Sequence, residues 1–258
     1  MITQAVNGVD TFIKIDGSGE PLVFVHGLGI DHTIWDDQID YFSKSYETVT
    51  YDLRGHGKSD APETGYSYGQ YSDDLGAMID ECVSPPVHLV GLSMGGAVAL
   101  HYALENPHNV RSLTLVAAHI CGYTSFDNWP NLYRIAKTEG LDAARDTWLN
   151  LRIFGSVKSD ALRWDRLGRM ISRFSCAPWT DPNPKYDDND DFSKADSLIV
   201  PSLLVCGTGD RDFLPITEHL ASKLPDYRLE LFNCGHLVSY ELPEEFNEAL
   251  AAFLREMT

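Results

Sequence analysis

The chain has 258 residues, of which 43% are hydrophobic and 22% charged, as in a globular protein with a sizeable core. Its 38 acidic and 20 basic residues give a formal net charge of −18, which argues against nucleic acids and anionic membrane surfaces as partners, because phosphate groups would be repelled. No apolar run reaches membrane-spanning length, and the N-terminus lacks a basic segment followed by an apolar one, so a cytoplasmic location is expected.

The cysteines indicate reduced thiols and no metal centre. Their number is odd and no two lie close in sequence, which is typical of a reducing compartment. No C-x-x-C pair or Cys/His cluster at zinc-like spacing occurs, so the sequence predicts neither a metal nor a cofactor. The five are Cys82, Cys121, Cys176, Cys206 and Cys234.

Short runs that are apolar on successive residues indicate strands covered on both faces, as in parallel sheets. Two N-terminal segments, ITQAV and TFIKIDG, are expected to add an antiparallel pair at one edge. The runs are PLVFVHG from Pro21, ETVTYD from Glu47, VHLVG from Val87, SLTLVAA from Ser112, SLLVCG from Ser202 and LELFNCG from Leu229.

Helical segments lie between these runs. Residues 34–43 and 70–81 are expected to form helices, and the final one, PEEFNEALAAFLREM from Pro243, places its apolar residues on one stripe. Pro243 and the two glutamates after it are typical of a helix start. The alternation predicts a doubly wound α/β fold, with a mostly parallel central sheet and helices on both faces.

One interval breaks this alternation. From about His119 to Leu198 no strand-like run occurs, and two segments, around Trp148 and Trp164, have helical spacing. We expect a helical cap over residues 119–198, inserted into a core domain of residues 1–118 and 199–258. The stretch DPNPKYDDNDD, from Asp181 to Asp191, is expected to be a solvated connection within it.

The run VGLSMGG, residues 90–96, contains the pattern G-x-S-x-G between an apolar strand and a segment suited to a helix. A serine at such a tight strand-to-helix turn is forced toward a left-handed backbone, which costs about 1–3 kcal/mol and requires small neighbours, here Gly91 and Gly95. The turn would hold the hydroxyl clear of the backbone at the carboxyl edge of the sheet. Ser93 is therefore the predicted nucleophile.

A serine nucleophile needs a base, and the base needs a carboxylate that fixes its tautomer. His236 follows the last strand-like run and is expected at the same sheet edge as Ser93. Asp210 follows SLLVCG and is the favoured carboxylate, with Asp212 as the alternative.

A developing oxyanion needs two donors. The main-chain amide of Met94, at the start of the expected helix, would be one, and that of Leu28, among the glycines of VFVHGLG, the other. Substrate-pocket residues are expected among the aromatic and histidine side chains of the insertion. The candidates are His119, Trp129, Trp148 and Trp179.

The motifs HGLG, YDLRGHGKSD, GLSMGG, GTGD and CGHLVSYELPEEF, in this order, resemble the α/β-hydrolase superfamily over the whole chain outside the insertion. The resemblance implies a triad of Ser93, Asp210 and His236 and an oxyanion hole from Leu28 and Met94. Among its members the chain is most similar in RGHG-x-SD and GLSMGG to small esterases and 3-oxoadipate enol-lactonase-like hydrolases. A serine at position 93 departs from haloalkane dehalogenases and epoxide hydrolases, which need aspartate there.

The sequence therefore predicts a serine hydrolase, of carboxylesterase or lactonase type, that cleaves a small-molecule ester or lactone as a monomer or homodimer. Carbon–carbon bond hydrolysis stays an alternative, although those enzymes usually carry asparagine where this chain has Leu92. Cofactor-free perhydrolysis uses the same triad and is a further alternative. A ligand receptor of the same fold, with slow or no turnover, is the alternative from another functional class.

Overall fold

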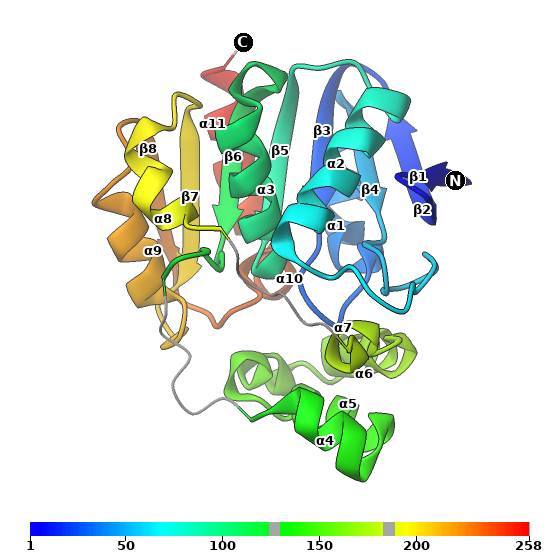
Figure 1. The fold of residues 1–258 in the computed structure, drawn as a ribbon. Helices are drawn as coiled ribbons and strands as arrows, with labels where there is room; N and C mark the ends of the chain where they lie inside the picture. Colours follow the sequence, from blue (N-terminus) through cyan, green and yellow to red (C-terminus); the bar gives the residue numbers. More distant parts are fainter. Residues whose placement is uncertain (124–129, 183–188, 258) are drawn as a thin grey trace.

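The structure is a computed structural model, and it describes residues 1–123, 130–182 and 189–257. Its centre is an eight-stranded sheet in the order β1-β2-β4-β3-β5-β6-β7-β8 (Figure 1). The β2 strand runs antiparallel to β1 and β4, and all neighbours from β4 to β8 pair in parallel, as the sequence predicts. The strands are β1 (Ile2–Val6), β2 (Val9–Gly17), β3 (Glu20–Val25), β4 (Tyr46–Tyr51), β5 (Val87–Leu92), β6 (Val110–Val116), β7 (Ser202–Gly207) and β8 (Tyr227–Phe232).

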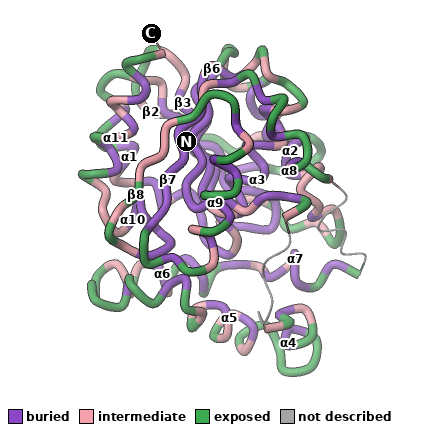
Figure 2. The backbone as a smooth tube through the Cα atoms, turned by 90° about the vertical axis from the view of Figure 1, so that its left-hand side faces the viewer, coloured by how far each residue is buried: buried purple, intermediate pink, exposed green. Residues whose placement is uncertain are grey.

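Helices cover both faces of this sheet, which agrees with the predicted fold class. Figure 2 shows α1 and α11 on one side and α2, α3 and α8 on the other. The α-helices are α1 (Asp36–Phe42), α2 (Tyr68–Cys82), α3 (Met94–Glu105), α4 (Leu132–Glu139), α5 (Leu141–Leu149), α6 (Ala161–Arg173), α7 (Ala177–Thr180), α8 (Asp191–Lys194), α9 (Leu214–Ala221), α10 (Val238–Glu241) and α11 (Pro243–Arg255). The 3-10 helices are η1 (His32–Trp35), η2 (Pro107–Asn109), η3 (Arg152–Phe154), η4 (Ser156–Ser159) and η5 (Ala195–Ser197).

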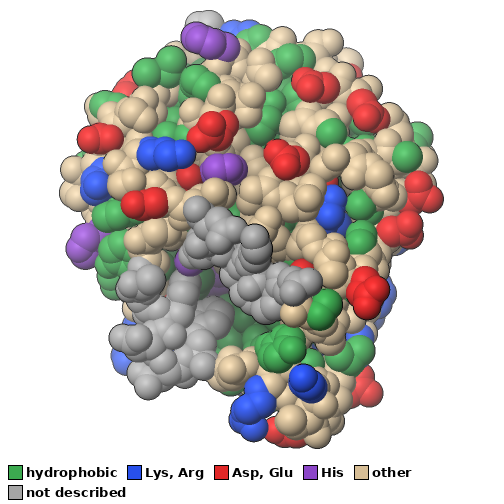
Figure 3. Space-filling view, in the orientation of Figure 1, with side chains coloured by type: hydrophobic (Ala, Val, Ile, Leu, Met, Phe, Trp, Pro, Cys, Tyr) green, Lys and Arg blue, Asp and Glu red, His purple; other side chains and the backbone are tan. Residues whose placement is uncertain are grey.

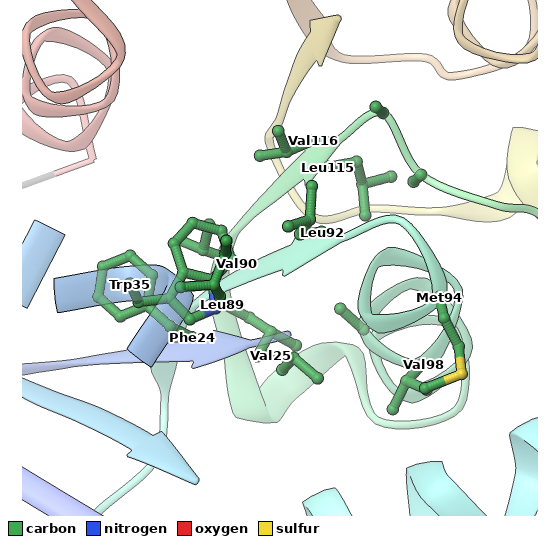
Figure 4. Packing of buried hydrophobic residues seen from close by; sticks show 14 of the residues in the cluster. Phe24, Val25, Trp35, Leu89, Val90, Leu92, Met94, Val98, Leu115 and Val116 are labelled. Carbon is green, nitrogen blue, oxygen red and sulfur yellow. The ribbon is translucent and has the colours of Figure 1, made fainter. Parts of the chain in front are cut away.

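The order of the central strands brings two loops together. The chain passes from β3 to β4 on one side, and β5 returns to the other side of β3. The segments after β3 and β5 therefore leave the sheet side by side at its carboxyl edge, which is where α/β sheets bind ligands. Figure 4 shows Leu92 at the end of β5 close to Leu115 of β6, with Met94 beside Val98 on α3. Buried side chains of this kind fix the turn between β5 and α3.

Helices α4 to α7 and the turns between them, residues 132–180, form a separate layer that we call the cap. Figure 1 shows this layer below the sheet, facing the carboxyl ends of its parallel strands. The predicted insertion also contains α8, but α8 packs against α3 in the body of the molecule. The helices expected around Trp148 and Trp164 are α5 and α6, while α4 had no separate prediction.

The expectation of a solvated connection from Asp181 to Asp191 is wrong at both ends. Asp181 is 2% exposed and Asp191 is fully buried. Each has a partner that the sequence could not reveal: Asp181 accepts a hydrogen bond from the amide of Gly65 (3.1 Å), and Asp191 Oδ1 lies 2.9 Å from His101 Nδ1. Residues 183–188 lie outside the described residues.

Acidic side chains are spread over the face of the molecule drawn in Figure 3, in keeping with the net charge of −18. Among the residues that the structure describes, no helix combines the length and the apolar character needed to cross a bilayer.

Candidate active site

Ser93 occupies the turn between β5 and α3 in the left-handed region that its motif predicts. Its φ is +55°, a conformation that costs a non-glycine residue about 1–3 kcal/mol. Its main chain is fixed on both sides of this strain, because its amide donates to the carbonyl of Val116 (2.9 Å) and its carbonyl accepts from the amides of Gly96 (2.9 Å) and His119 (3.0 Å). A Cβ added at Gly91 or Gly95 would collide with neighbouring backbone, so both positions require glycine.

His236 and Asp210 form a short, buried hydrogen bond. His236 Nδ1 lies 2.6 Å from Asp210 Oδ2, and their side chains are 2% and 1% exposed. Asp210 leaves the end of β7 and His236 the end of β8, which lie at the same sheet edge as Ser93. With Nδ1–H donated to the carboxylate, Nε2 of His236 is left as a proton acceptor.

The alternative carboxylate, Asp212, has a different partner. Arg152 of η3 donates to it through both Nε (2.7 Å) and Nη2, which ties the cap to the loop after β7. Asp210 Oδ1 accepts from the amides of Asp212 (3.2 Å) and Phe213 (3.2 Å), so the loop encloses the Asp210 carboxylate. In this geometry Asp210, and not Asp212, contacts His236.

The segment with Leu28 lies against the Ser93 turn. A Cβ added at Gly27 would be 3.3 Å from Ser93 Cβ, so the main chain before Leu28 lies close to the predicted nucleophile, with no room for a side chain between them. Met94 begins the 12-residue helix α3, whose first amides have no partner within the helix and carry a partial positive charge. Of the two residues predicted to supply oxyanion donors, Met94 therefore stands at the start of α3, directly after Ser93, and Leu28 in the loop after β3.

The residues predicted to line a substrate pocket lie in different parts of the molecule. His119 follows β6, and its ring lies 5.2 Å from that of Tyr68. Trp148 and Trp179 pack edge to face at 5.7 Å within the cap, and Trp148 reaches the core, since a Cβ at Gly29 would be 2.6 Å from its Nε1. Trp129 lies outside the described residues.

A cavity of about 450 Å³ adjoins the His236–Asp210 pair. Its walls come from the cap, through Arg152, Ile153 and Ser156, and from the loops after β7 and β8. Ser93, His119, Trp148 and Trp179 are not among its lining residues. The predicted aromatic pocket and this cavity are therefore two different regions.

Three further histidines are buried beside the site in structural roles. His26 holds the loop after β3: its Nδ1 donates to the carbonyl of Gly27 (2.8 Å), and its Nε2 accepts from the amide of Leu53 (3.0 Å). Burial lowers the pKa of His26 and brings that of His56 to about 3, so both rings are neutral at neutral pH.

The third, His32, belongs to the one described group of side chains close enough to share a metal ion, Asp31, His32 and Asp52. Asp52 already accepts from the amide and Nδ1 of His32 (2.8 Å each), and Asp31 accepts from Arg173 (2.7 Å). These bonds make the group a junction between the cap and the loop after β3.

Sequence reasoning missed Glu241, whose carboxylate oxygens accept from the amides of Gly235 (3.1 Å) and Leu237 (3.1 Å), on either side of His236. Glu241 ends the short helix α10, and a glutamate at the end of a helix is usually solvated, so no local signal in the sequence marks it.

Comparison with known proteins agrees with the fold. The 3-oxoadipate enol-lactonase 1 of Acinetobacter baylyi is 26% identical, over 100% of this chain and 97% of its own length. The 2-hydroxy-6-oxononadienedioate/2-hydroxy-6-oxononatrienedioate hydrolase of Burkholderia vietnamiensis is 30% identical, over 93% and 88%. The crystal structure of the enol-lactonase from Burkholderia xenovorans LB400 superposes with a TM-score of 0.89, covering 98% of this chain and 100% of that one at 24% identity. The profile of the alpha/beta hydrolase family matches residues 22–249, and the chain belongs to that family.

Proposed function

We propose that this hydrolase cleaves a small carboxylic ester or lactone through an acyl-enzyme on Ser93. The observation that carries the proposal is the buried 2.6 Å hydrogen bond between His236 and Asp210, at the sheet edge where Ser93 is held at φ +55°. A histidine oriented in this way can accept a proton from a serine hydroxyl and return it to a leaving group.

The reaction has two halves. In the first, Ser93 Oγ attacks the carbonyl carbon while His236 Nε2 takes its proton, and the amides of Leu28 and Met94 stabilise the oxyanion. The C–O bond to the alcohol then breaks, and His236 returns the proton to the departing oxygen. In the second half, water gives a proton to His236 and attacks the acyl carbon. The bond between that carbon and Ser93 Oγ then breaks as His236 returns the proton to Oγ, which releases the acid and restores the serine.

The cap supports a substrate of limited size. Trp148 touches the loop that carries Leu28, and it packs against Phe154 and Trp179 in a buried aromatic cluster in which Phe174 contacts Trp179. A cap rich in apolar aromatic side chains favours the uncharged acyl or ring portion of a small ester or lactone. The enol-lactonases among the similar proteins support a lactone as the substrate.

Substitution of Ser93 by alanine tests the mechanism. We expect kcat for a short activated ester to fall by about 10⁴-fold or more, because removal of a triad nucleophile leaves only binding and oxyanion stabilisation. Mass spectrometry of wild-type protein quenched during turnover should show an acyl adduct on the peptide that contains Ser93, absent from the variant. Hydrolysis that survives in a folded Ser93→Ala protein rejects the proposal.

Carbon–carbon bond hydrolysis is the second candidate, and the 30% identity to the Burkholderia vietnamiensis hydrolase favours it. A substrate panel that includes activated esters, lactones of graded ring size and a vinylogous 1,5-diketone separates the two. Comparison of kcat/KM across the panel reports transition-state binding, so the highest value identifies the substrate class.

A further inference from the structure

Glu241 is the last residue of α10, and its carboxylate bridges the main chain on both sides of His236. Oε2 accepts from the amide of Gly235 and Oε1 from the amide of Leu237, each at 3.1 Å. One side chain thus holds the main chain on both sides of a buried histidine, at the amides of Gly235 and Leu237. Hydrogen bonds to an ionised acceptor are stronger than those between neutral groups.

The histidine needs such support, because its segment has no regular structure. Residues 233–237 connect β8 to α10 without forming a helix or strand. Asp210 fixes the ring through Nδ1, but a bond at the ring tip does not set the backbone from which the ring projects. A proton-transfer group must stay within about 0.5 Å of its productive position, so the backbone around His236 also requires restraint.

The helix that carries Glu241 is anchored to both parts of the molecule. Gln38 Nε2 donates to the carbonyl of Ser239 (3.0 Å), and the hydroxyl of Tyr240 donates to the carbonyl of Arg163 in the cap helix α6 (2.8 Å). A Cβ added at Gly235 would lie 3.0 Å from Glu241 Oε1 and would collide with Ser156 Oγ of the cap. Glu241 is therefore held in a packed position beside the His236 loop.

We propose that Glu241 is a positioning residue, which acts through the amides of Gly235 and Leu237 to keep His236 aligned with Asp210. The inference rests on the proposed function, in which His236 transfers the proton. It adds a fourth side chain to that machinery, one that contacts backbone rather than substrate.

Two variants at this position test the proposal. Glu241→Ala removes both acceptors, and Glu241→Gln keeps one carbonyl oxygen while it presents an NH₂ group to the second amide. Because a small misplacement of a reacting group costs on the order of 10²-fold, we expect kcat to fall about 100-fold in the alanine variant and about 10-fold in the glutamine variant, with KM within about twofold. Glu248→Gln, which removes the same charge from an exposed position of α11, is the matched control and should leave kcat unchanged.

Proton NMR of the unliganded protein reports the alignment without any turnover. The Nδ1 proton of His236, in its short bond to Asp210, should give a far-downfield resonance in the wild type and in Glu248→Gln, and should be shifted or lost in both Glu241 variants. The proposal is overturned if the Glu241 variants keep both the resonance and kcat of the wild type. It is also overturned if they have a lower melting temperature while the resonance stays intact. If the alanine variant does not fold, the glutamine variant decides. Failure of the proposed function leaves this readout valid, because the resonance depends on the His236–Asp210 bond and not on activity.

Discussion

The core and the cap hold their residues by different means. In the core, the main chain of Ser93 is bonded on both sides to neighbouring backbone, and apolar strands bury the turn from both faces. The cap is joined to the core largely through side chains, as where Arg163 pairs with Asp37 and Arg173 with Asp31. Main-chain bonds in a buried sheet are insensitive to sequence detail, whereas side-chain contacts depend on individual residues. Chemistry is therefore expected to reside in the core, and substrate selection in the cap.

The largest effect is expected within the core, where two neighbouring aspartates have separate roles. Asp210→Asn should lower kcat by about 10⁴-fold, because the amide favours the wrong tautomer of His236. Asp212→Asn weakens the ion pair with Arg152, in which the Asp212 side chain is 6% exposed, but Asp212 does not contact His236, so kcat should change by less than about threefold. Steady-state kinetics on a short ester separates the two. Equal losses in both variants would contradict the assignment of Asp210 to His236.

This comparison also shows how far sequence reasoning reaches. Runs such as SLLVCG identify strands because burial on both faces excludes polar residues, and β7 begins and ends where that run predicts. β8 lies at the sheet edge, with Leu231 44% exposed, so an apolar run there did not mean burial on both sides. The order of motifs predicts Ser93, Asp210 and His236, since each lies in the turn or loop that follows a strand.

The cap and the supporting residues could not be predicted in the same way. Helical spacing locates α5 and α6, but their placement depends on arginines that meet aspartates more than a hundred positions away in the sequence. Acidic side chains are usually found at the surface, and three of them here have partners that only the tertiary structure brings near. These are Asp181 and Glu241, which accept hydrogen bonds from main-chain amides, and Asp191, which pairs with a histidine. Single-sequence patterns do not contain that information.

The contact between Trp148 and Gly29 should be the most sensitive point between cap and core. Gly29→Ala places a Cβ 2.6 Å from Trp148 Nε1 at a φ of +75°, so the free energy of unfolding should fall by about 2–3 kcal/mol and KM should rise as the tryptophan moves. Gly8→Ala is the matched control, with φ +78° and no atom within 4 Å of the added Cβ, and should cost only about 1 kcal/mol. Urea titration measures both. An equal cost in the two variants would show that the cap moves freely away from this loop.

The ion pairs between α6 and the core should contribute different amounts to the free energy of unfolding, according to how deeply the aspartate of each pair is buried. Asp31 is 4% exposed, and although burial raises its pKa, hydrogen bonds from Thr33 and Arg173 leave that pKa lowered overall. Its stabilising contribution is thus present above the usual pKa of 3.8 and is lost as the pH falls through the lower, folded-state pKa. At neutral pH, Arg173→Gln should cost about 1–2 kcal/mol, and Arg166→Gln, opposite the exposed Asp36, less than about 0.5 kcal/mol. Similar costs for both would mean that the pair at Asp31 adds nothing beyond a surface contact.

The contact that should depend on pH is that of His56, a core residue whose ring stacks on Phe174 of the cap at 4.6 Å. Burial lowers its pKa to about 3, so the unfolded chain binds a proton at this position that the folded protein does not, and stability is lost as the pH falls below about 6.5. His56→Phe keeps the stacking and removes the titration, and should flatten the pH dependence of the free energy of unfolding by at most about 1.4 kcal/mol per pH unit between pH 6.5 and 4.5. His108→Phe, at an exposed position, should leave the slope unchanged. An unaltered slope in His56→Phe would mean that this ring is protonated in the folded protein, and that the contact between core and cap at Phe174 tolerates charge.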